Sequence, residues 1–458
     1  MKELGVFCGS EQAKFTSQTV SERIRCLKRI ISKRKVNAII GKDNPDRRKC
    51  SKCPATMMVW FTIALGLFGD DSYRQVFKSL HRFAKNATPT RSALTLARAK
   101  LGIPVLAEVY RSVVKCLCNE TTRGAFYRGL RLVAVDGFVL DLPDSEANCR
   151  AFGKPKNGSS LGAFPQLRIV ALCEVGSHVF FEFLAKPIRC GEVTLAKHVY
   201  RSLPAGSLLT FDIGFFATEL VKIVLERKSH FLGRAKVSRI LKPIETLRDG
   251  SYLAKIYDTD YERIHDRNGT TIRVIEYTLD DPQRVGHNEV HRLVTSMLDP
   301  LEHPATVLIE LYHERWEEEI AIDEIKTHAR TAATLRSQSP AGVIQEVYGL
   351  LTAHFVVRKT MFDAASQATV APRRISFTGA LKILRVRLPE APRSDRGIKQ
   401  WHDNLIAEIS EEVLPERRNR INPRVIKKTQ SKWPKARPEH RKLPKLEKKF
   451  PDAVKVLI

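Results

Sequence analysis

YHERWEEEIAIDEIK, residues 312–326, contains neither glycine nor proline and is rich in glutamate, so it is predicted to form a helix. On a helix that turns by about 100° per residue, four polar side chains fall on one stripe about 21 Å long: Tyr312, Arg315, Glu319 and Lys326. Apolar side chains flank this stripe. A carboxylate and two cations in such a place are costly unless they are paired or hold a metal or a phosphate.

The opposite face of this helix carries Glu314, Glu317 and Glu324 and is predicted to be solvated. Taken alone, the stripe also has a simpler interpretation, a surface ion pair between Arg315 and Glu319 four residues apart. The helix by itself favours this simpler interpretation slightly, and the rest of the chain favours a functional site.

The charge of the chain favours a polyanionic partner. Its 458 residues, enough for two to four domains, include 77 Lys and Arg against 50 Asp and Glu, which gives a net charge of +27. Nucleic acid is the simplest partner for such an excess of cations, although a ribosome-associated or anionic-membrane protein would share it.

The composition predicts a soluble cytoplasmic protein that acts on the bacterial nucleoid. Nine cysteines without a paired framework favour a reducing compartment. The first residues lack the basic start and apolar run of a signal peptide. The longest apolar run, residues 55–68, is too short to span a bilayer and is predicted to be a buried core helix.

The first hundred residues are predicted to be helical. They include a basic amphipathic segment, residues 20–35, and several apolar-periodic stretches. A helix-turn-helix that binds DNA and a helical packing domain are equally compatible with this pattern. Cys50 and Cys53 form a lone CxxC pair, and because a zinc site needs four ligands, free thiols in a loop are expected there.

Two buried strands are each followed by an aspartate. The run LVAVDG, residues 132–137, contains Asp136 at its end, and the run SLLTF, residues 207–211, is followed by Asp212. A second strand is predicted directly after the first, from residue 138 to residue 143. Carboxylates at the ends of buried strands are where ligand sites gather in α/β sheets. Three strands followed by helix, strand, helix and strand indicate a mixed α/β sheet rather than a parallel doubly wound one.

A β-rich insertion and a basic arm are predicted on either side of the central helix. Residues 237–300 have weak helical periodicity and strand-like pieces at residues 252–257, 271–279 and 289–297. A long apolar helix over residues 342–362 is expected to pack behind the central helix. Residues 417–458 carry 15 Lys or Arg against three acidic residues, which suits an extended arm along a phosphate backbone or a solvated tail that orders on DNA.

Asp136, Asp212 and Glu319 together match the needs of two-metal phosphoryl transfer. Two Mg²⁺ ions about 3.5–4 Å apart need shared hard oxygen ligands. Glu318 lies about 80° off the stripe and is set aside, whereas Asp323 lies within about 40° of Glu319 and stays an alternative third ligand.

The chain resembles DDE transposases of the bacterial IS4 insertion-sequence group along nearly its whole length. The central helix matches the Y-x2-R-x3-E-x6-K signature of that group, and the two aspartates stand in LVAVDG and FDIGFF. A PD…N…FG pattern also matches, with Pro143, Asp144, Asn148 and Gly153. The group usually has arginine after the second aspartate, where this chain has Ile213, so a phosphate or structural contact of that arginine is lost.

The resemblance implies an α/β fold with an RNase H-like catalytic core and a β-rich insertion, preceded by a helical N-terminal domain that binds DNA and followed by a basic C-terminal region. The expected boundaries are 1–110 for the N-terminal domain, 111–236 and 301–370 for the two parts of the core, 237–300 for the insertion and 371–458 for the C-terminal region.

The resemblance also implies a role for each matching residue. The implied catalytic residues and ligands of two Mg²⁺ ions, for which Mn²⁺ can substitute, are Asp136, Asp212 and Glu319. The implied phosphate-binding residues at the transposon end are Tyr312, Arg315 and Lys326. Lys236, after the predicted strand over residues 231–236, is a further phosphate-binding candidate, although a lysine at a sheet edge is the more common explanation.

A cut-and-paste DNA transposase follows from this resemblance. Water would free a 3′ hydroxyl at the transposon end, and that hydroxyl would attack target DNA; a hairpin intermediate is implied only by analogy. The expected partners are double-stranded DNA and a second copy of the chain, because two ends are cut together, with no membrane and no nucleotide cofactor. The alternatives are a non-catalytic DNA-binding protein derived from a transposase and an RNase H-like nuclease without strand transfer.

Overall fold

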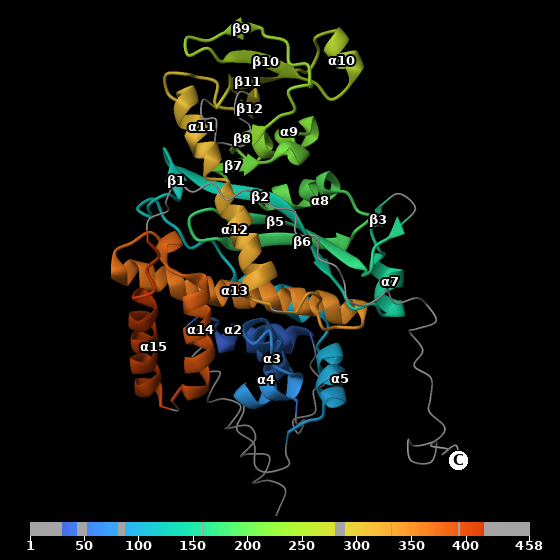
Figure 1. The fold of residues 1–458 in the computed structure, drawn as a ribbon, viewed down its shortest axis with the longest axis vertical. Coiled ribbons are helices and arrows are strands. Elements are labelled where there is room, and N and C mark those ends of the chain that lie inside the picture. Colours follow the sequence, from blue (N-terminus) through green and yellow to red (C-terminus); the bar gives the residue numbers. More distant parts are fainter. Residues whose placement is uncertain are drawn as a thin grey trace, which may run out of the picture.

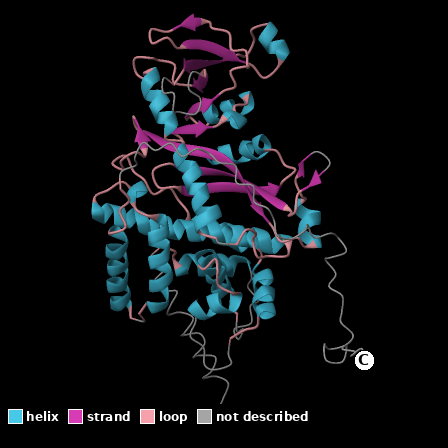
Figure 2. Ribbon diagram, in the orientation of Figure 1, coloured by secondary structure: helices cyan, strands magenta, loops and turns pink. Residues whose placement is uncertain are grey.

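The structure, a computed structural model, describes residues 30–43, 53–80, 88–157, 160–279, 289–330, 332–392 and 394–415. It has a helical part at one end of its long axis and a sheet-containing part at the other (Figure 1). Figure 2 shows how sharply the strands are concentrated in the second part. In the part of the chain that is described, no helix is long and apolar enough to cross a membrane.

Five strands form the centre of a mixed sheet in the order β6-β5-β2-β7-β8. Their bounds are β2 (Leu130–Asp141), β5 (Gln166–Glu174), β6 (Val179–Pro187), β7 (Ser207–Phe211) and β8 (His230–Arg234). The strands β2, β5 and β6 form an antiparallel meander, and β7 and β8 continue the sheet parallel to β2. This is the strand arrangement of an RNase H-like core, so the expected mixed α/β fold is confirmed. A two-residue strand, β1 (Phe126–Tyr127), also pairs with β2.

The predicted insertion extends this same sheet. It contains β9 (Glu245–Thr246), β10 (Tyr252–Ile256), α10 (Asp260–Ile264), β11 (Thr270–Tyr277) and β12 (His291–Thr295). Because β12 pairs antiparallel with β8, the order continues as β8-β12-β11-β10-β9. The fully buried Arg273 holds the insertion to the start of α11, since it pairs with Asp249 and donates a 2.6 Å hydrogen bond to the carbonyl of His303.

Helices cover both faces of the sheet. The helices α8 (Glu192–Val199) and α9 (Thr218–Glu226) cover one face, and α11 (Ala305–His313), α12 (Trp316–Asp323) and α13 (Pro340–Ala368) cover the other. Side chains alternate along a strand. In β2, Val133 and Val135 pack against α8 and α9, whereas Ala134 and Phe138 belong to the clusters on the side of α11 to α13. Asp136 therefore lies on the face that α12 crosses.

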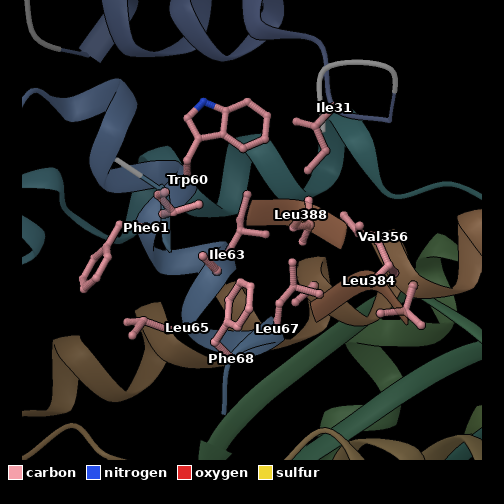
Figure 3. Packing of buried hydrophobic residues seen from close by; sticks show 14 of the residues in the cluster. Ile31, Trp60, Phe61, Ile63, Leu65, Leu67, Phe68, Val356, Leu384 and Leu388 are labelled. Atoms are coloured by element: carbon pink, nitrogen blue, oxygen red, sulfur yellow. The ribbon is translucent and has the colours of Figure 1, made fainter. Parts of the chain in front are cut away.

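The long apolar run forms the core of the helical part. It corresponds to α3 (Ala55–Leu67), whose side chains are buried around nearly its whole circumference (Figure 3). The helix packs against α13 at two glycines. A Cβ at Gly349 would lie 2.3 Å from the carbonyl oxygen of Thr62, and one at Gly66 would lie 2.7 Å from the Cβ of Ala353. The absence of side chains there lets the two backbones approach closely.

The helices at the two ends of the described chain share one hydrophobic core. The N-terminal ones are α2 (Lys33–Asp43), α4 (Tyr73–Leu80), α5 (Arg91–Leu101) and α6 (Ile103–Val113), and the C-terminal ones are α14 (Phe377–Arg387) and α15 (Asp395–Ser410). Their core joins Trp60 and Ile63 to Val356, Leu384 and Leu388 (Figure 3). The expected boundaries at residues 110 and 370 therefore do not separate hydrophobic cores within the described residues.

The helices described before residue 113 contribute side chains to this shared core. Three regions discussed above lie outside the described residues: most of the basic segment over residues 20–35, Cys50, and the basic arm over residues 417–458. Cys53 is half-buried just before α3.

Candidate active site

Two of the predicted carboxylates stand side by side on neighbouring parallel strands. Val135 and Phe211 are the last residue pair between β2 and β7, and Asp136 and Asp212 follow them directly. The sequence predicted a strand end at Asp136, but β2 continues as one strand to Asp141, and β5 is the neighbouring strand that pairs with it beyond this point. The carboxylate of Asp136 thus lies where the sheet loses its β7 neighbour.

The helices α11 and α12 bring Glu319 to this edge. Tyr312 near the end of α11 donates a 3.3 Å hydrogen bond to the carbonyl of Phe211, the residue before Asp212. Burial raises the pKa of Tyr312, so the phenol keeps its proton for this contact. Farther along, α12 crosses β2 and buries Ala321 and Ile322 over the sheet (Figure 1).

The pKa of Asp136 reports that the three carboxylates act on one another. This pKa is raised from 3.8 to about 6, mainly by burial and to a smaller extent by the negative charges of Glu319 and Asp212. A hydrogen bond of 2.7 Å from the backbone N–H of Gly137 and the charge of Arg315 act in the opposite direction. The predicted trio is therefore close enough for mutual repulsion.

Arg315 lies among these carboxylates. It is 8% exposed and donates a 2.9 Å hydrogen bond to Glu319, and its guanidinium lies 5.9 Å from the ring centre of Tyr312. Burial alone would lower the pKa of Arg315, but Tyr312, Asp212 and Glu319 more than offset this and raise it. Its Nε has no hydrogen-bond partner among the described residues. This leaves a buried N–H group that could donate a hydrogen bond to a phosphate oxygen.

Glu318, which the helical wheel set aside, is buried against Asp136. It is 1% exposed, and its two carboxyl oxygens lack a hydrogen bond of ordinary geometry within the described part of the chain. Burial raises the pKa of Glu318 well above its usual value, and the charge of Asp136 adds to this effect. Arg315 and the backbone N–H of Asp136 oppose it. A buried carboxyl whose charged form is disfavoured thus stands behind the predicted site.

The central helix is not regular, which corrects the prediction of one continuous helix. It turns at Glu314 and Arg315 with hydrogen bonds to the third residue back, such as Arg315 N–H to the Tyr312 carbonyl at 3.1 Å. It then widens into a π-helical turn over Glu324–His328. A tight turn and a wide turn both change the angle per residue. The calculated stripe therefore does not hold beyond Glu319.

The face predicted to be solvated is largely buried. Glu317 and Glu324 are 4% and 3% exposed, and only Glu314 on that face is half-exposed. The prediction was wrong because buried cations and histidines from other elements face these carboxylates. Glu324, for example, accepts a 2.8 Å hydrogen bond from Nε of Arg358 in α13.

The other candidates from the sequence are mostly exposed. Lys326 is exposed on the π-helical turn. Asp323 is exposed, accepts a hydrogen bond from Thr327 and lies 3.2 Å from His328, so the structure gives it no contact with the other two carboxylates. Lys236 is exposed after β8, and Ile213 is half-buried in the short turn after Asp212.

The loop motif after the first aspartate has a structural role. Ser145 caps the short helix α7 (Glu146–Phe152), and Gly153 ends it with φ of +76°, a value that favours glycine. The side-chain amide of Asn148, which is fully buried, donates to the carbonyls of Pro143 at 3.2 Å and Ser337 at 3.0 Å. Asn148 thereby joins this loop to the segment that leads into α13.

The donor set suits a hard divalent cation. Asp136, Asp212 and Glu319 offer only carboxylate oxygens, which Mg²⁺ and Mn²⁺ prefer. Among the described residues, no three His, Cys, Asp or Glu side chains are arranged to enclose an ion, and Glu319 is hydrogen-bonded to Arg315.

A cavity of about 610 Å³ lies beside the turn between α11 and α12. Its lining includes Arg123, Glu314, Glu317 and Arg373, and it does not include the three predicted carboxylates. The cavity and the predicted catalytic site are therefore separate places.

Two family models match the chain. The insertion element 4 transposase N-terminal model matches residues 21–111, and the transposase DDE domain model matches residues 127–356, which is half of the chain. The chain therefore belongs to the DDE transposases and carries an IS4-type N-terminal region. It is an enzyme of a family that catalyses phosphoryl transfer, and this family implies a divalent metal.

Several known proteins are similar to the chain. The chain is 27% identical over 395 residues to transposase InsG for insertion sequence element IS4 of Escherichia coli strain K12, which covers 84% of this chain and 88% of that protein. It is also 26% identical over 171 residues to putative transposase InsZ of the same organism. That alignment covers 37% of this chain and 57% of InsZ. Among solved structures, it aligns with the piggyBac transposase synaptic complex with hairpin DNA at a TM-score of 0.43 and 12% identity, over 89% of this chain and 88% of that chain.

Proposed function

We propose that this transposase cleaves DNA at the ends of an insertion sequence and joins the freed ends to target DNA. In cleavage, a water oxygen would attack phosphorus and the bond to the 3′ oxygen would break, which leaves a 3′ hydroxyl. In transfer, that hydroxyl would attack a target phosphate and displace another 3′ oxygen. The observation that carries this proposal is that Asp136 and Asp212 follow neighbouring parallel strands, with Glu319 close enough to raise the pKa of Asp136, beside a buried arginine.

The metal ligands in this proposal are Asp136, Asp212 and Glu319. Divalent cations held there would supply Lewis-acid activation of the attacking oxygen and charge for the leaving oxygen. The strand register fixes the first two carboxylates relative to each other, and the Tyr312 contact with Phe211 holds α11 against the end of β7. Cleavage would need no covalent bond between enzyme and DNA, because these side chains serve as ligands.

Arg315 would grip the scissile region of the DNA backbone. Its Nε–H is buried and lacks a partner within the described residues, while its second terminal nitrogen is bonded to Glu319. A guanidinium can therefore bind a phosphate oxygen through one edge and orient Glu319 through another. Tyr312 would offer its phenol next to the same phosphate, and Lys326 would add a point charge farther along the DNA.

The expected substrate is double-stranded DNA, and the expected assembly is a homodimer. A net charge of +27 favours long contact with phosphates. Two transposon ends must be cut together, which suits a pair of active sites. The place of action would be the bacterial cytoplasm, at the nucleoid.

A plasmid that carries the two ends of the encoding element tests this function. With Mg²⁺ the protein should release the element, and Asp136→Asn should abolish cleavage while Asp323→Asn, a change at an exposed carboxylate, should retain it. Absence of cleavage with Mg²⁺ or Mn²⁺, at DNA concentrations that give binding, would leave a non-catalytic DNA-binding protein. A pre-cut end with a 3′ hydroxyl should give joined product; cleavage without joining would indicate a nuclease.

A further inference from the structure

Five buried charged side chains and one half-buried arginine form a cluster on the side of α12 that faces away from Glu319. The side chains, here called the buried ion cluster, are His178, Glu317, Glu324, His354, Arg358 and Arg373. They come from the β5–β6 turn, α12, the π-helical turn, α13 and the segment after α13. The proposed catalytic steps use none of them.

His178 joins two carboxylates that stand seven residues apart on the central helix. Its Nε2 lies 2.9 Å from Glu317 and its Nδ1 lies 3.3 Å from Glu324. Residues seven apart on a helix lie about two turns apart on one side. The backbone of His178 has φ of +59°, a left-handed conformation that costs free energy for a residue other than glycine. The fold thus keeps an unfavourable backbone in order to place this ring.

Glu324 ties the far end of α12 to α13. It accepts hydrogen bonds of 2.9 Å from Nε2 of His354 and 2.8 Å from Nε of Arg358. Burial alone would raise the pKa of Glu324, but Arg358 and the two histidines hold it well below its usual range. The carboxylate is therefore ionised and paired inside the protein.

Arg373 holds the near end of α12. It pairs with Glu314 in the turn that precedes Arg315, and it lies 3.6 Å from Glu317. The cluster therefore contacts the helix both before and after the segment that contains Glu318 and Glu319. On a helix, Glu317 and Glu319 point in nearly opposite directions, so fixing one fixes the other.

We propose that the buried ion cluster sets the rotation of α12 about its axis and thereby keeps Glu319 on the side of the helix that faces Asp136 and Asp212. This inference rests on the proposed function. Its members are positioning residues, because none touches the predicted site. A buried ion network contributes little net stability compared with apolar packing, but it permits only one geometry. Outer residues of this kind typically change metal affinity or activity by 10–100-fold when they are replaced.

Two substitutions separate positioning from folding. Glu317→Gln keeps the shape of the side chain and removes its charge. His178→Asn removes the bridge and retains a residue that tolerates positive φ. The matched control is Glu174→Gln, because Glu174 is a fully buried carboxylate on the same hairpin. It accepts hydrogen bonds from Leu117, Cys118, Ser177 and Arg131, none of which belongs to α12.

Three measurements on the full-length protein are compared: Mn²⁺ affinity by electron paramagnetic resonance, single-turnover cleavage at saturating DNA, and thermal unfolding. Glu317→Gln and His178→Asn should lower Mn²⁺ affinity and cleavage rate about tenfold or more with unchanged DNA affinity. Glu174→Gln should lower the unfolding temperature alone. Wild-type Mn²⁺ affinity and rate in both variants, or losses that match only the unfolded fraction as in the control, would overturn the proposal. If the wild type failed to cleave, the proposed function would fall, and Mn²⁺ affinity would still decide the positioning role.

Discussion

Arg315 and Glu319 are joined by a hydrogen bond of 2.9 Å, so the predicted third metal ligand is held by the cation four residues before it. The same guanidinium lowers the pKa of Asp136, and the charge of Asp212 raises the pKa of Arg315. One arginine therefore partly neutralises all three carboxylates. A metal ion would compete with Arg315 for Glu319, so removal of this arginine should favour metal binding.

Arg315→Ala should strengthen metal binding and weaken catalysis. Removal of the cation leaves the carboxylates with less compensation, so Mn²⁺ affinity should rise. Cleavage should slow by about 10²–10³-fold, the usual cost of losing a donor aimed at developing charge. Electron paramagnetic resonance and single-turnover cleavage measure the two effects. Arg315→Lys, which keeps the charge without the planar fork, should restore metal affinity more than rate; weaker Mn²⁺ binding with an unchanged rate in Arg315→Ala would contradict the argument.

Asp136→Asn should stabilise the metal-free protein at neutral pH. The pKa of Asp136 is about 6 in the folded protein against an ordinary 3.8, so the folded state binds more protons than the unfolded state between these values. The stability contributed by this carboxyl is thus present below about pH 4 and lost as pH rises through about 6. The free energy of unfolding of the variant should exceed that of the wild type by about 1–3 kcal/mol at pH 7.5 and by almost nothing at pH 4. Unfolding with chelator at both pH values tests this, and equal or lower stability of Asp136→Asn at pH 7.5 would refute it. Added Mg²⁺ should stabilise only the wild type.

The two strands that precede Asp136 and Asp212 could be predicted because strand formation depends on residues that are close together in the sequence. β-branched runs form buried strands, and the register of parallel strands sets Asp136 beside Asp212. The position of Arg315 next to Glu319 also follows from a spacing of four residues on one helix. The β-rich insertion was expected from its turns, whereas its continuation of the core sheet depends on pairing between β8 and β12, which lie far apart in the chain.

The state of Glu317 and Glu324 could not be predicted in this way. Their partners are distant in sequence, as with His178, which is 139 residues from Glu317. A helical wheel assigns unpartnered glutamates to solvent, and it also assumes a constant angle per residue. The tight turn at Arg315 contains no glycine or proline from which it could be predicted. The burial of Glu318 behind Asp136 was therefore not predicted.

Lys326→Ala should weaken DNA binding without affecting stability. The side chain is exposed on the π-helical turn, so its loss leaves no buried cavity. If Lys326 contacts one phosphate, the slope of log affinity against log salt should fall by about 0.9, which is about eightfold in affinity at 0.1 M salt. Fluorescence anisotropy over a salt series measures the slope. Lys399→Ala, at an exposed lysine of α15 in the helical part, serves as the comparison; an equal change in both variants would remove any special role of Lys326.

Gly349→Ala should destabilise the packing of α3 against α13, whereas Gly41→Ala should not. A Cβ at Gly349 would lie 2.3 Å from the carbonyl oxygen of Thr62, a backbone atom that cannot turn aside, so the helices must separate at a cost of about 1–3 kcal/mol. Gly41 is exposed within α2 and a Cβ there meets nothing within 4 Å, so alanine should gain roughly 0.5–1 kcal/mol from helix propensity. Urea unfolding followed by circular dichroism compares the two. Because α13 also carries His354 and Arg358, the Gly349 variant should lose Mn²⁺ affinity as well, and retention of both stability and affinity would show that α3 does not support the site through α13.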